Sequence, residues 1–523
     1  MLVYGDHRER VEPEERLQGL RERLPKIAAM APGIERHGKL VGALVEAGQL
    51  LQGVADEGWP AVELNQFVYR LAAAVVRSWD SRFAALGEIP WVPQVDLPGE
   101  VELRLPEGFA FYAVYPEAYV EAARRLRLSA PPRVIGIRSI GTTLGATVAA
   151  TLGAAPPLTL RPFGDPFARQ VELPRGVPES DAHYLIVDEG PGLSGSSFGA
   201  VADALEGRGV PLERIAFLPS HGGDLGSYAS DAHRARWAKA QRAAAEFNTT
   251  WLAELFGPLD DVTGSDPSER RKFLGRHKGE RVLLKFAGLG SIGERKLAIA
   301  RSLHASGFTP EPIGFVHGFL VERWCEGAKP LDGGEKPIAE IGRYIGARSR
   351  LFPAEETDGA SIAELLTMCR RNISLTFGSD ACRILDSFDT EALQARVRRV
   401  RTDNKLDRHE WLRLPGGKLV KTDAVDHHQA HDLIGCQDLA WDIGGAVTEF
   451  DLDAGETGTL IASSGAAIGL ELLDFCRIAY ASFRLGRAVL AGQIGEADRY
   501  RRSLHLLLDQ HVCPETRQES LVD

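Results

Sequence analysis

One stretch in the middle of the chain, Tyr184 to Phe198, limits the fold more than any other. It begins with an apolar run, Tyr184 to Val187, which is typical of a buried strand. Two adjacent acids, Asp188 and Glu189, follow, and a loop of glycines and serines leads into a predicted helix at 200–205. Such a strand, loop and helix N-terminus favour an anion, because backbone N–H groups and the helix dipole point at it. The two carboxylates would repel a phosphate unless they bind something else, such as sugar hydroxyls or Mg²⁺.

The surrounding region, from about residue 86 to 256, alternates between strand-like and helix-like segments. The apolar runs that predict strands are 133–137, 158–163, 184–187 and 214–220. Alternation of this kind predicts an α/β fold, with a parallel sheet covered by helices on both faces. Sites in such sheets lie at the carboxyl ends of the strands. The alternative for the acid-pair loop alone is an ordinary strand-to-helix turn.

Two further loops in this region carry groups that suit a diphosphate. The loop after strand 133–137 supplies a cation, hydroxyls and glycines before a helix, which matches what phosphate oxygens need. Its residues are Arg138, Ser139, Gly141, Thr142, Thr143 and Gly145. The segment 161–169 contains two prolines and a glycine and carries Arg161 and Arg169, with Arg175 close by. An ordinary surface loop is the alternative for this third segment.

Together these loops resemble the phosphoribosyl-diphosphate (PRPP) site of type I phosphoribosyltransferases. The resemblance implies that Asp188 and Glu189 hold the ribose hydroxyls and that Arg138 stabilises the departing diphosphate. It also implies Mg²⁺ bound with PRPP. The residues that would cradle the 5′-phosphate and the diphosphate are Gly192, Ser194, Gly195, Ser196, Ser197, Ser139, Gly141, Thr142 and Thr143, with Arg161 and Arg169 on a flexible hood. The family places its loop glycine seven positions along from the first acid, whereas Gly195 is the eighth, so this loop is one residue longer.

Length and composition limit the broad class of protein to which the chain can belong. A chain of 523 residues should hold two or three domains, and its formal net charge of −11 argues against general binding to nucleic acid. No apolar run is long enough to span a membrane, and the N-terminus lacks a signal core. The cysteines show no paired spacing, which favours a reduced, cytoplasmic protein.

Domain boundaries follow from local composition. Residues 1–85 have the pattern of helices and carry no candidate catalytic or binding residues. We expect them to form an extension that packs on the next domain or on a partner subunit, so a homodimer is left open. Residues 86–256 form the phosphoribosyltransferase-like domain. Residues 257–270 are rich in Gly, Pro, Asp and Ser and predict a linker. The last domain is predicted at 271–510.

The start of that last domain resembles the amino lobe of kinase-like folds, most closely that of aminoglycoside phosphotransferases. Two strand-like runs surround 276–280, and the second carries Lys285. A helix follows with Glu294 near its start, and a second strand pair ends at a hinge with Glu322 and Trp324. The resemblance implies that these four residues bind ATP, with Lys285 on the phosphates and paired with Glu294. A small β-meander with an exposed lysine is the alternative.

The segment 402–450 carries the second half of the kinase resemblance and departs from it at one place. A clear hairpin leads to Asp423, where the family has a metal-binding Asp, and Asp442 matches a structural acid of the following helix. In the catalytic loop, Asp403 falls at the family's His, Lys405 at its catalytic Asp and Glu410 at its metal-binding Asn. Glu410 can still bind Mg²⁺. Either Asp403 or Asp407 substitutes as the base, or the domain binds a nucleotide without transferring phosphate.

A zinc site is the competing interpretation of the same segment. Its four candidate ligands are His427, His428, His431 and Cys436. Their spacing fits no closed site.

Two functions remain open from the sequence. The first is a phosphoribosyltransferase that moves the phosphoribosyl group of PRPP to a nitrogen acceptor, fused to an ATP-binding, small-molecule kinase-like domain. The second is a regulator that senses PRPP or ATP without turnover, which the longer loop and Lys405 favour. The acceptor cannot be read from the sequence.

Overall fold

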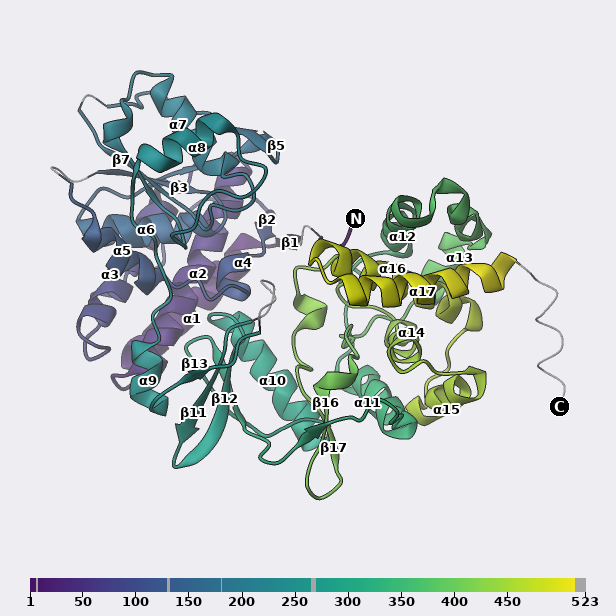
Figure 1. The fold of residues 1–523 in the computed structure, drawn as a ribbon. Coiled ribbons are helices and arrows are strands. Elements are labelled where there is room, and N and C mark those ends of the chain that lie inside the picture. Colours follow the sequence, from purple (N-terminus) through teal and green to yellow (C-terminus); the bar gives the residue numbers. More distant parts are fainter. Residues whose placement is uncertain (6–7, 129–131, 180, 265–269, 513–523) are drawn as a thin grey trace. The chain divides into compact units, whose positions relative to one another are not determined.

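The computed structural model describes residues 1–5, 8–128, 132–179, 181–264 and 270–512 (Figure 1). The contacts within the chain define two compact units. The first, called the N-terminal unit below, comprises residues 7–295 and 313–322. The second, called the C-terminal unit, comprises residues 1–6, 296–312 and 323–523.

A five-stranded parallel sheet forms the centre of the N-terminal unit, as the alternating pattern predicts. The strands in spatial order are β4 (Leu158–Leu160), β3 (Arg133–Ile137), β7 (Tyr184–Val187), β8 (Ile215–Leu218) and β9 (Gln241–Arg242). Every neighbouring pair is parallel. After β3 the chain adds β4 on one side and then β7 on the other, so the order reverses between β3 and β7. Ligands of open α/β sheets bind at such a switch point.

Helices cover both faces of this sheet. Ile135, Ile186 and Phe217 face one side and pack with Phe198 and Trp237 of α7 (Ser196–Glu206) and α8 (Asp231–Lys239). Val134, Leu185 and Leu218 face the other side and join a larger core. That core is covered by α5 (Pro116–Arg125) and α6 (Ile140–Leu152), and Figure 1 shows the two pairs of helices on opposite sides of β3 and β7.

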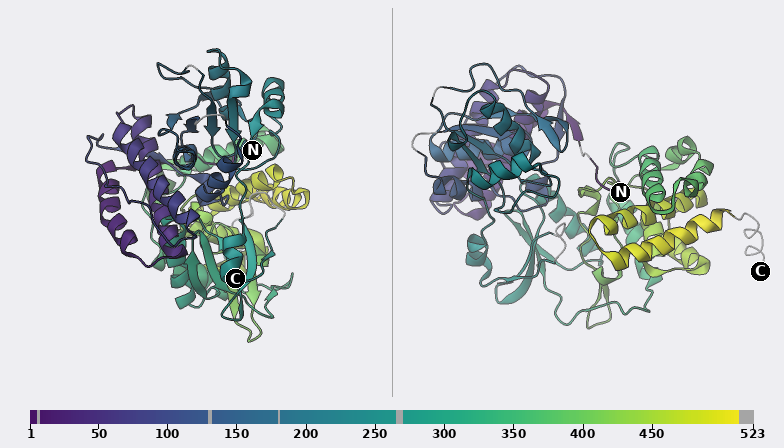
Figure 2. Two further views of the ribbon diagram at one scale, coloured as in Figure 1. Left: turned by 90° about the vertical axis from the view of Figure 1, so that its left-hand side faces the viewer. Right: turned by 45° about the horizontal axis from the view of Figure 1, so that its top comes forward.

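Three helices occupy the region predicted as a helical extension. Its helices are α1 (Pro13–Ala29), α2 (Ile34–Asp56) and α3 (Val62–Asp80), and they lie side by side in the purple part of Figure 2. Helix α2 packs tightly on α6, since a Cβ built at Gly48 would lie 1.9 Å from the Thr143 hydroxyl oxygen. Shorter elements complete this part: β1 (Arg8–Val11) antiparallel to β2 (Val101–Arg104), α4 (Glu107–Ala110), the hairpin β5 (Phe163–Asp165) and β6 (Ala168–Gln170), and α9 (Thr250–Phe256).

A second sheet belongs to the same unit and matches the predicted kinase-like strands. Its order is β10 (Asp260–Asp261), β11 (Lys272–His277), β12 (Glu280–Phe286), β14 (Phe319–Arg323) and β13 (Pro312–Val316). Helix α10 (Ser291–Ala305) follows β12, as predicted, and the unit boundary at 295–296 falls within it. The other boundary, at 322–323, falls at the end of β14.

The two sheets of the N-terminal unit share one core. Tyr115 and Trp251 pack against Phe319, Phe286 and the ring of His317. The same core reaches Phe273 of β11 and the apolar faces of α2 and α6. The predicted linker at 257–270 therefore lies within a compact unit, and its residues 265–269 lie outside the described residues.

The C-terminal unit is mainly helical. Its helices are α11 (Ile338–Leu351), α12 (Ile362–Phe377), α13 (Thr390–Arg396), α14 (Leu439–Phe450), α15 (Ala454–Ser464), α16 (Leu470–Leu490) and α17 (Ile494–Val512). A small antiparallel sheet joins β15 (Lys329–Pro330), β16 (Trp411–Arg413) and β17 (Leu419–Lys421), and β16 and β17 form the predicted hairpin. None of the helices in the described ranges is long and apolar enough to cross a membrane.

The shared core predicts that a fragment ending at residue 256 will be much less stable than one ending at 323. The shorter fragment loses Phe273, Phe286 and Phe319, and full burial of one such side chain contributes about 1.5–3 kcal/mol. We expect the 1–256 fragment to bind a hydrophobic dye and to melt without a cooperative transition, while 1–323 melts cooperatively. Equal melting temperatures for the two fragments would contradict a shared core.

Candidate functional site

The acid pair lies at the carboxyl end of β7, beside the switch point of the parallel sheet. A Cβ built at Gly141, in the first turn of α6, would lie 2.6 Å from the Val187 carbonyl oxygen and 3.2 Å from Asp188 Oδ1. A Cβ at Gly108 of α4 would lie 2.6 Å from Glu189 Oε2. Both acids thus contact backbone that only glycine allows, and the loops after β3 and β7 meet at Asp188.

Both acids have strongly shifted proton affinities. Burial raises the pKa of Asp188 to about 8. Backbone N–H groups and Arg161 stabilise the carboxylate and oppose part of this rise. Burial, followed by the charges of Asp188 and Glu107, raises the pKa of Glu189 to about 8. Both residues keep part of their surface exposed, so a ligand can reach them. Adjacent reachable carboxyls with raised pKa values are typical of functional sites.

The loop after the acids has the backbone shape of an anion site. Gly190, Gly192 and Gly195 all have positive φ, at 110°, 66° and 63°, which ordinary side chains disfavour. Helix α7 begins directly after Gly195, and within the described chain no side chain caps it. Its first-turn N–H groups are therefore oriented toward the loop.

The serines of this loop are partly engaged by the hood. Ser196 Oγ donates a hydrogen bond to the Pro166 carbonyl at 2.7 Å, and Ser194 Oγ accepts one from the Ser196 N–H at 3.2 Å. Both side chains are buried, whereas Ser197 is half-buried. The predicted hood is the β5–β6 hairpin, which carries Arg169.

The hairpin tip also contacts a second loop, because Phe167 stacks on Tyr228 with ring centroids 4.6 Å apart. The predicted hood therefore contacts the glycine and serine loop after β7 through Pro166, and the loop that carries Tyr228 through Phe167.

The loop after β3 contains a strained residue. Ser139 has φ 119° and ψ −114°, which is rare for a side-chain-bearing residue and is found at functional turns. Among the other predicted ligands, the Thr142 hydroxyl is buried with no hydrogen-bond partner among the described residues, and the Thr143 hydroxyl faces Gly48 of α2. The side chain of Thr143 is thus directed at the helical extension.

Asp56, the last residue of α2, binds both predicted diphosphate arginines. Arg161 Nη2 lies 2.5 Å and Arg138 Nη1 3.1 Å from its carboxylate. Arg161 Nη1 also donates to the Arg138 carbonyl at 2.7 Å. Burial alone would raise the pKa of Asp56, but the two arginines and Gln52 hold it below its ordinary value. The sequence gives no signal for Asp56, because it lies at the end of a helix without a motif.

In the C-terminal unit, the predicted catalytic loop is held by Asp442 of α14. The Asp442 carboxylate accepts the backbone N–H groups of Asp403 at 2.8 Å and Asn404 at 2.9 Å, the structural role that the resemblance implies. Burial and the neighbouring Asp403 raise the pKa of Asp442 to about 6. Asp403 itself is fully buried and is bonded by the Tyr344 hydroxyl. It presents no exposed oxygen to a substrate in this conformation.

The remaining charges of this loop neutralise one another. Glu410 lies 2.6 Å from Lys421 Nζ and 2.7 Å from Lys405 Nζ. Burial opposes ionisation of Glu410, but the two lysines hold its pKa below the ordinary value. Asp407 lies 2.7 Å from Arg484 and 3.6 Å from Lys405. Both candidate bases and the candidate metal ligand thus sit in ion pairs, and the sequence pattern gave no sign of Lys421 or Arg484 as partners.

The predicted metal ligands nevertheless come together. Donor atoms of Glu410, Asp423 and His427 lie within 4.8 Å of one another. No three of the residues proposed for zinc, His427, His428, His431 and Cys436, form such a group among the described residues. His428 and Cys436 are buried, and His427 Nδ1 lies 3.3 Å from Asp403 Oδ1. The structure thus groups His427 with the acids.

The nucleotide residues lie on the predicted elements. Lys285 is buried on β12, Glu294 lies in the first turn of α10, Glu322 lies on β14 and Trp324 follows that strand. Glu294 forms an ion pair with Lys39 of α2 at 2.9 Å. The pairing of Lys285 with Glu294 stays a prediction.

Similarity to known proteins lies in solved structures of low sequence identity. No family model and no curated protein matches the chain. Solved structures similar to about half of the chain are kinases or phosphotransferases. Choline kinase LicA from Streptococcus pneumoniae is 15% identical with a TM-score of 0.37, covering 50% of this chain and 97% of that one. A choline/ethanolamine kinase family protein from Mesorhizobium loti is 15% identical with a TM-score of 0.35, covering 51% and 92%. Spectinomycin phosphotransferase APH(9)-Ia is 12% identical with a TM-score of 0.34, covering 50% and 94%.

The raised pKa values of the acid pair predict a pH-dependent stability. Between the ordinary carboxyl pKa values and about pH 8, the folded chain binds more protons than the unfolded chain. The free energy of unfolding therefore falls as the pH rises through this range. Each proton of difference contributes about 1.4 kcal/mol per pH unit. We expect the double variant Asp188→Asn, Glu189→Gln to lose this slope and to be the more stable protein near pH 8, by urea denaturation at several pH values. Parallel pH profiles for the two proteins would rule out raised pKa values.

Proposed function

We propose that the N-terminal unit binds PRPP and transfers its phosphoribosyl group to a nitrogen nucleophile. The observation that carries the proposal is the acid pair at the carboxyl end of β7, beside the switch point and between two helix N-termini. A plain phosphate loop has no use for two carboxylates, whereas a ribose phosphate supplies hydroxyls for the acids and a phosphate for the loop.

In this reaction the bond from ribose C1 to the diphosphate oxygen breaks, and a bond from C1 to the acceptor nitrogen forms. The diphosphate leaves with the electron pair, and the acceptor nitrogen loses its proton. Asp188 and Glu189 would hold the ribose hydroxyls in place while charge develops at C1. Arg138 and Arg161 would stabilise the departing diphosphate, since fixed cations aimed at developing charge lower the barrier.

Mg²⁺ fits this site as a companion of PRPP. The acid pair offers hard oxygen donors, and burial is the main cause of its raised pKa values, so a bound cation would favour the ionised carboxylates. Mg²⁺ would supply charge neutralisation for the diphosphate. The hood, which already contacts the phosphate loop through Pro166, would exclude water from the reacting carbon.

For the kinase-like part we propose ATP binding with weak or no phosphate transfer. Lys285 and Glu322 supply the predicted nucleotide contacts, and Asp423 is the remaining predicted ligand for Mg²⁺. Glu410 fits Mg²⁺ poorly, because two lysine ammonium groups already neutralise it. With Lys405 at the base position, the second candidate function is a regulator that senses PRPP or ATP without turnover.

Removal of the acid pair should abolish PRPP binding. Each lost hydrogen bond to a charged acceptor costs about 1.5–3 kcal/mol, so Asp188→Asn with Glu189→Gln should weaken PRPP binding by more than about a hundredfold. Titration calorimetry with PRPP and Mg²⁺ measures the change, and diphosphate release with a panel of nitrogen bases tests turnover. Unchanged PRPP affinity would remove the basis of the proposal, and binding without diphosphate release would favour the regulator.

A variant at Asp56 serves as a comparison for the acid-pair variant, because it removes a carboxylate that contacts the arginines and leaves Asp188 and Glu189 in place. Asp56→Asn removes a carboxylate that competes for Arg138 and Arg161, so it should tighten binding of diphosphate while leaving the acid pair intact. A weaker affinity in Asp56→Asn would mean that Asp56 instead orients the arginines for the ligand.

ATP binding is tested by thermal stabilisation of the whole protein. ATP with Mg²⁺ should raise the unfolding temperature, and Lys285→Ala and Asp423→Ala should each abolish most of that shift. Glu410→Gln should keep the ATP-dependent shift, because Glu410 is occupied by lysines. No shift with ATP in the unmodified protein would remove the nucleotide-binding proposal, and labelled phosphate on a small-molecule acceptor would establish transfer.

A further inference from the structure

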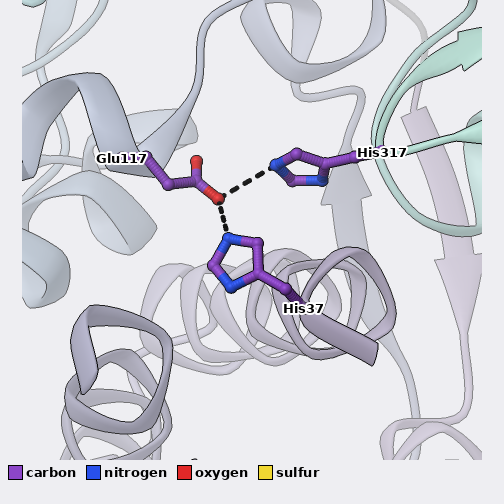
Figure 3. Close-up of side chains that lie close together, drawn as sticks. All are labelled: His37, Glu117 and His317. Atoms are coloured by element: carbon purple, nitrogen blue, oxygen red, sulfur yellow. Dashed lines mark hydrogen bonds and ion pairs between the residues drawn. The ribbon is translucent and has the colours of Figure 1, made fainter. Parts of the chain in front are cut away.

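A buried cluster of two histidines and one glutamate shares no residue with either proposed site. His37 comes from α2, Glu117 from the first turn of α5 and His317 from the turn between β13 and β14 (Figure 3). Nε2 of His37 lies 2.6 Å and Nε2 of His317 3.0 Å from the same oxygen, Glu117 Oε1. The side chains are 0%, 4% and 2% exposed for His37, Glu117 and His317. All three residues belong to the N-terminal unit.

The cluster places a carboxylate in apolar surroundings. Phe83 packs against the ring of His37, and Tyr115 and Trp251 pack against the ring of His317. The nearby Arg36 does not pair with Glu117, since its guanidinium donates to the carbonyls of Met30, Phe83 and Ala84. A buried carboxylate is costly unless a positive charge and hydrogen bonds satisfy it.

The hydrogen bonds to the histidines leave the second carboxylate oxygen of Glu117 unused. Among the described residues, Glu117 Oε2 is buried and has no hydrogen-bond partner. This oxygen is therefore open to a further bond, and its burial makes an unsatisfied state costly.

We propose that His37, Glu117 and His317 bind a divalent transition metal, with Zn²⁺ as the ion that suits the donors best. Their ligand atoms lie within 4.8 Å of one another. Two imidazole nitrogens and both oxygens of one carboxylate supply four donor atoms, the number of a closed zinc site. Mg²⁺ prefers oxygen donors and suits two imidazoles poorly.

The surroundings of His37 match those of a metal ligand. Its Nδ1 lies 2.9 Å from Ser78 Oγ on α3. Metal-bound histidines usually donate their other ring N–H to such a partner, which fixes the tautomer with Nε2 toward the metal. The Tyr115 hydroxyl donates to the His317 carbonyl at 2.7 Å and fixes the turn that carries the third ligand. An ion here would link α2 of the helical extension, α5 and the turn between β13 and β14.

The test starts from the full-length chain with any affinity tag removed. Metal analysis of the purified protein should find about one zinc per chain. Protein made without zinc should take up Co²⁺ and show the visible absorption of a tetrahedral site with nitrogen and oxygen ligands. Zn²⁺ should raise the unfolding temperature of that protein, and Mg²⁺ at the same concentration should not. Absence of bound zinc together with absence of a Co²⁺ spectrum overturns the proposal.

Variants assign the ion to this cluster. His317→Gln and Glu117→Gln should lose the bound zinc, and His427→Gln, which alters another group of potential metal ligands, should retain it. Ser78→Ala keeps all three ligands, so it remains informative if a ligand variant fails to fold, and it should weaken zinc affinity by about tenfold or more. Zinc content that survives in His317→Gln, or that is lost only in His427→Gln, places the ion elsewhere and overturns the proposal.

Discussion

Close packing of α2 against its neighbours holds the N-terminal unit together. Gly48 lets α2 approach α6 at the start of the helix that follows β3, and a Cβ at Gly53 would lie 2.9 Å from a Leu103 methyl group of β2. The same helix places His37 in the buried cluster near its N-terminal end. At its C-terminal end it places Asp56 beside Arg138 and Arg161. The extension is therefore built into the proposed sites, and its glycines are needed because larger residues would separate the helices.

Local patterns predicted the elements well. Strand β7 and strand β3 coincide with their predicted runs, because short and mainly apolar runs between turn signals specify a buried strand. The hairpin β16–β17 was also identified, since Pro and Gly residues mark its turn. Helix α7 begins four residues before its predicted start, because Gly195 allows a left-handed turn directly ahead of it.

The missing part of the prediction concerns partners rather than elements. Asp56 ends a helix, Lys421 ends a strand and Arg484 lies within α16. None of the three belongs to a motif, and only the tertiary fold brings them to their partners Arg161, Glu410 and Asp407. The buried cluster was missed for the same reason, because its members lie on three segments that are far apart in the chain. The core that unites β11, β12 and β14 with α5 likewise depends on aromatic side chains whose contacts no local pattern encodes.

The ion pairs of Asp56 determine how the proposed phosphate site responds to salt. An anion that binds two unpaired arginines releases counterions from both, and its affinity falls steeply as ionic strength rises. Here Asp56 already neutralises part of the charge of Arg138 and Arg161, so an incoming phosphate exchanges one ion pair for another. The net electrostatic gain is the difference between the two pairs, and it depends only weakly on ionic strength. Selectivity among phosphates then rests on the acids and the glycine loop, which respond to the shape of the ligand rather than to its charge.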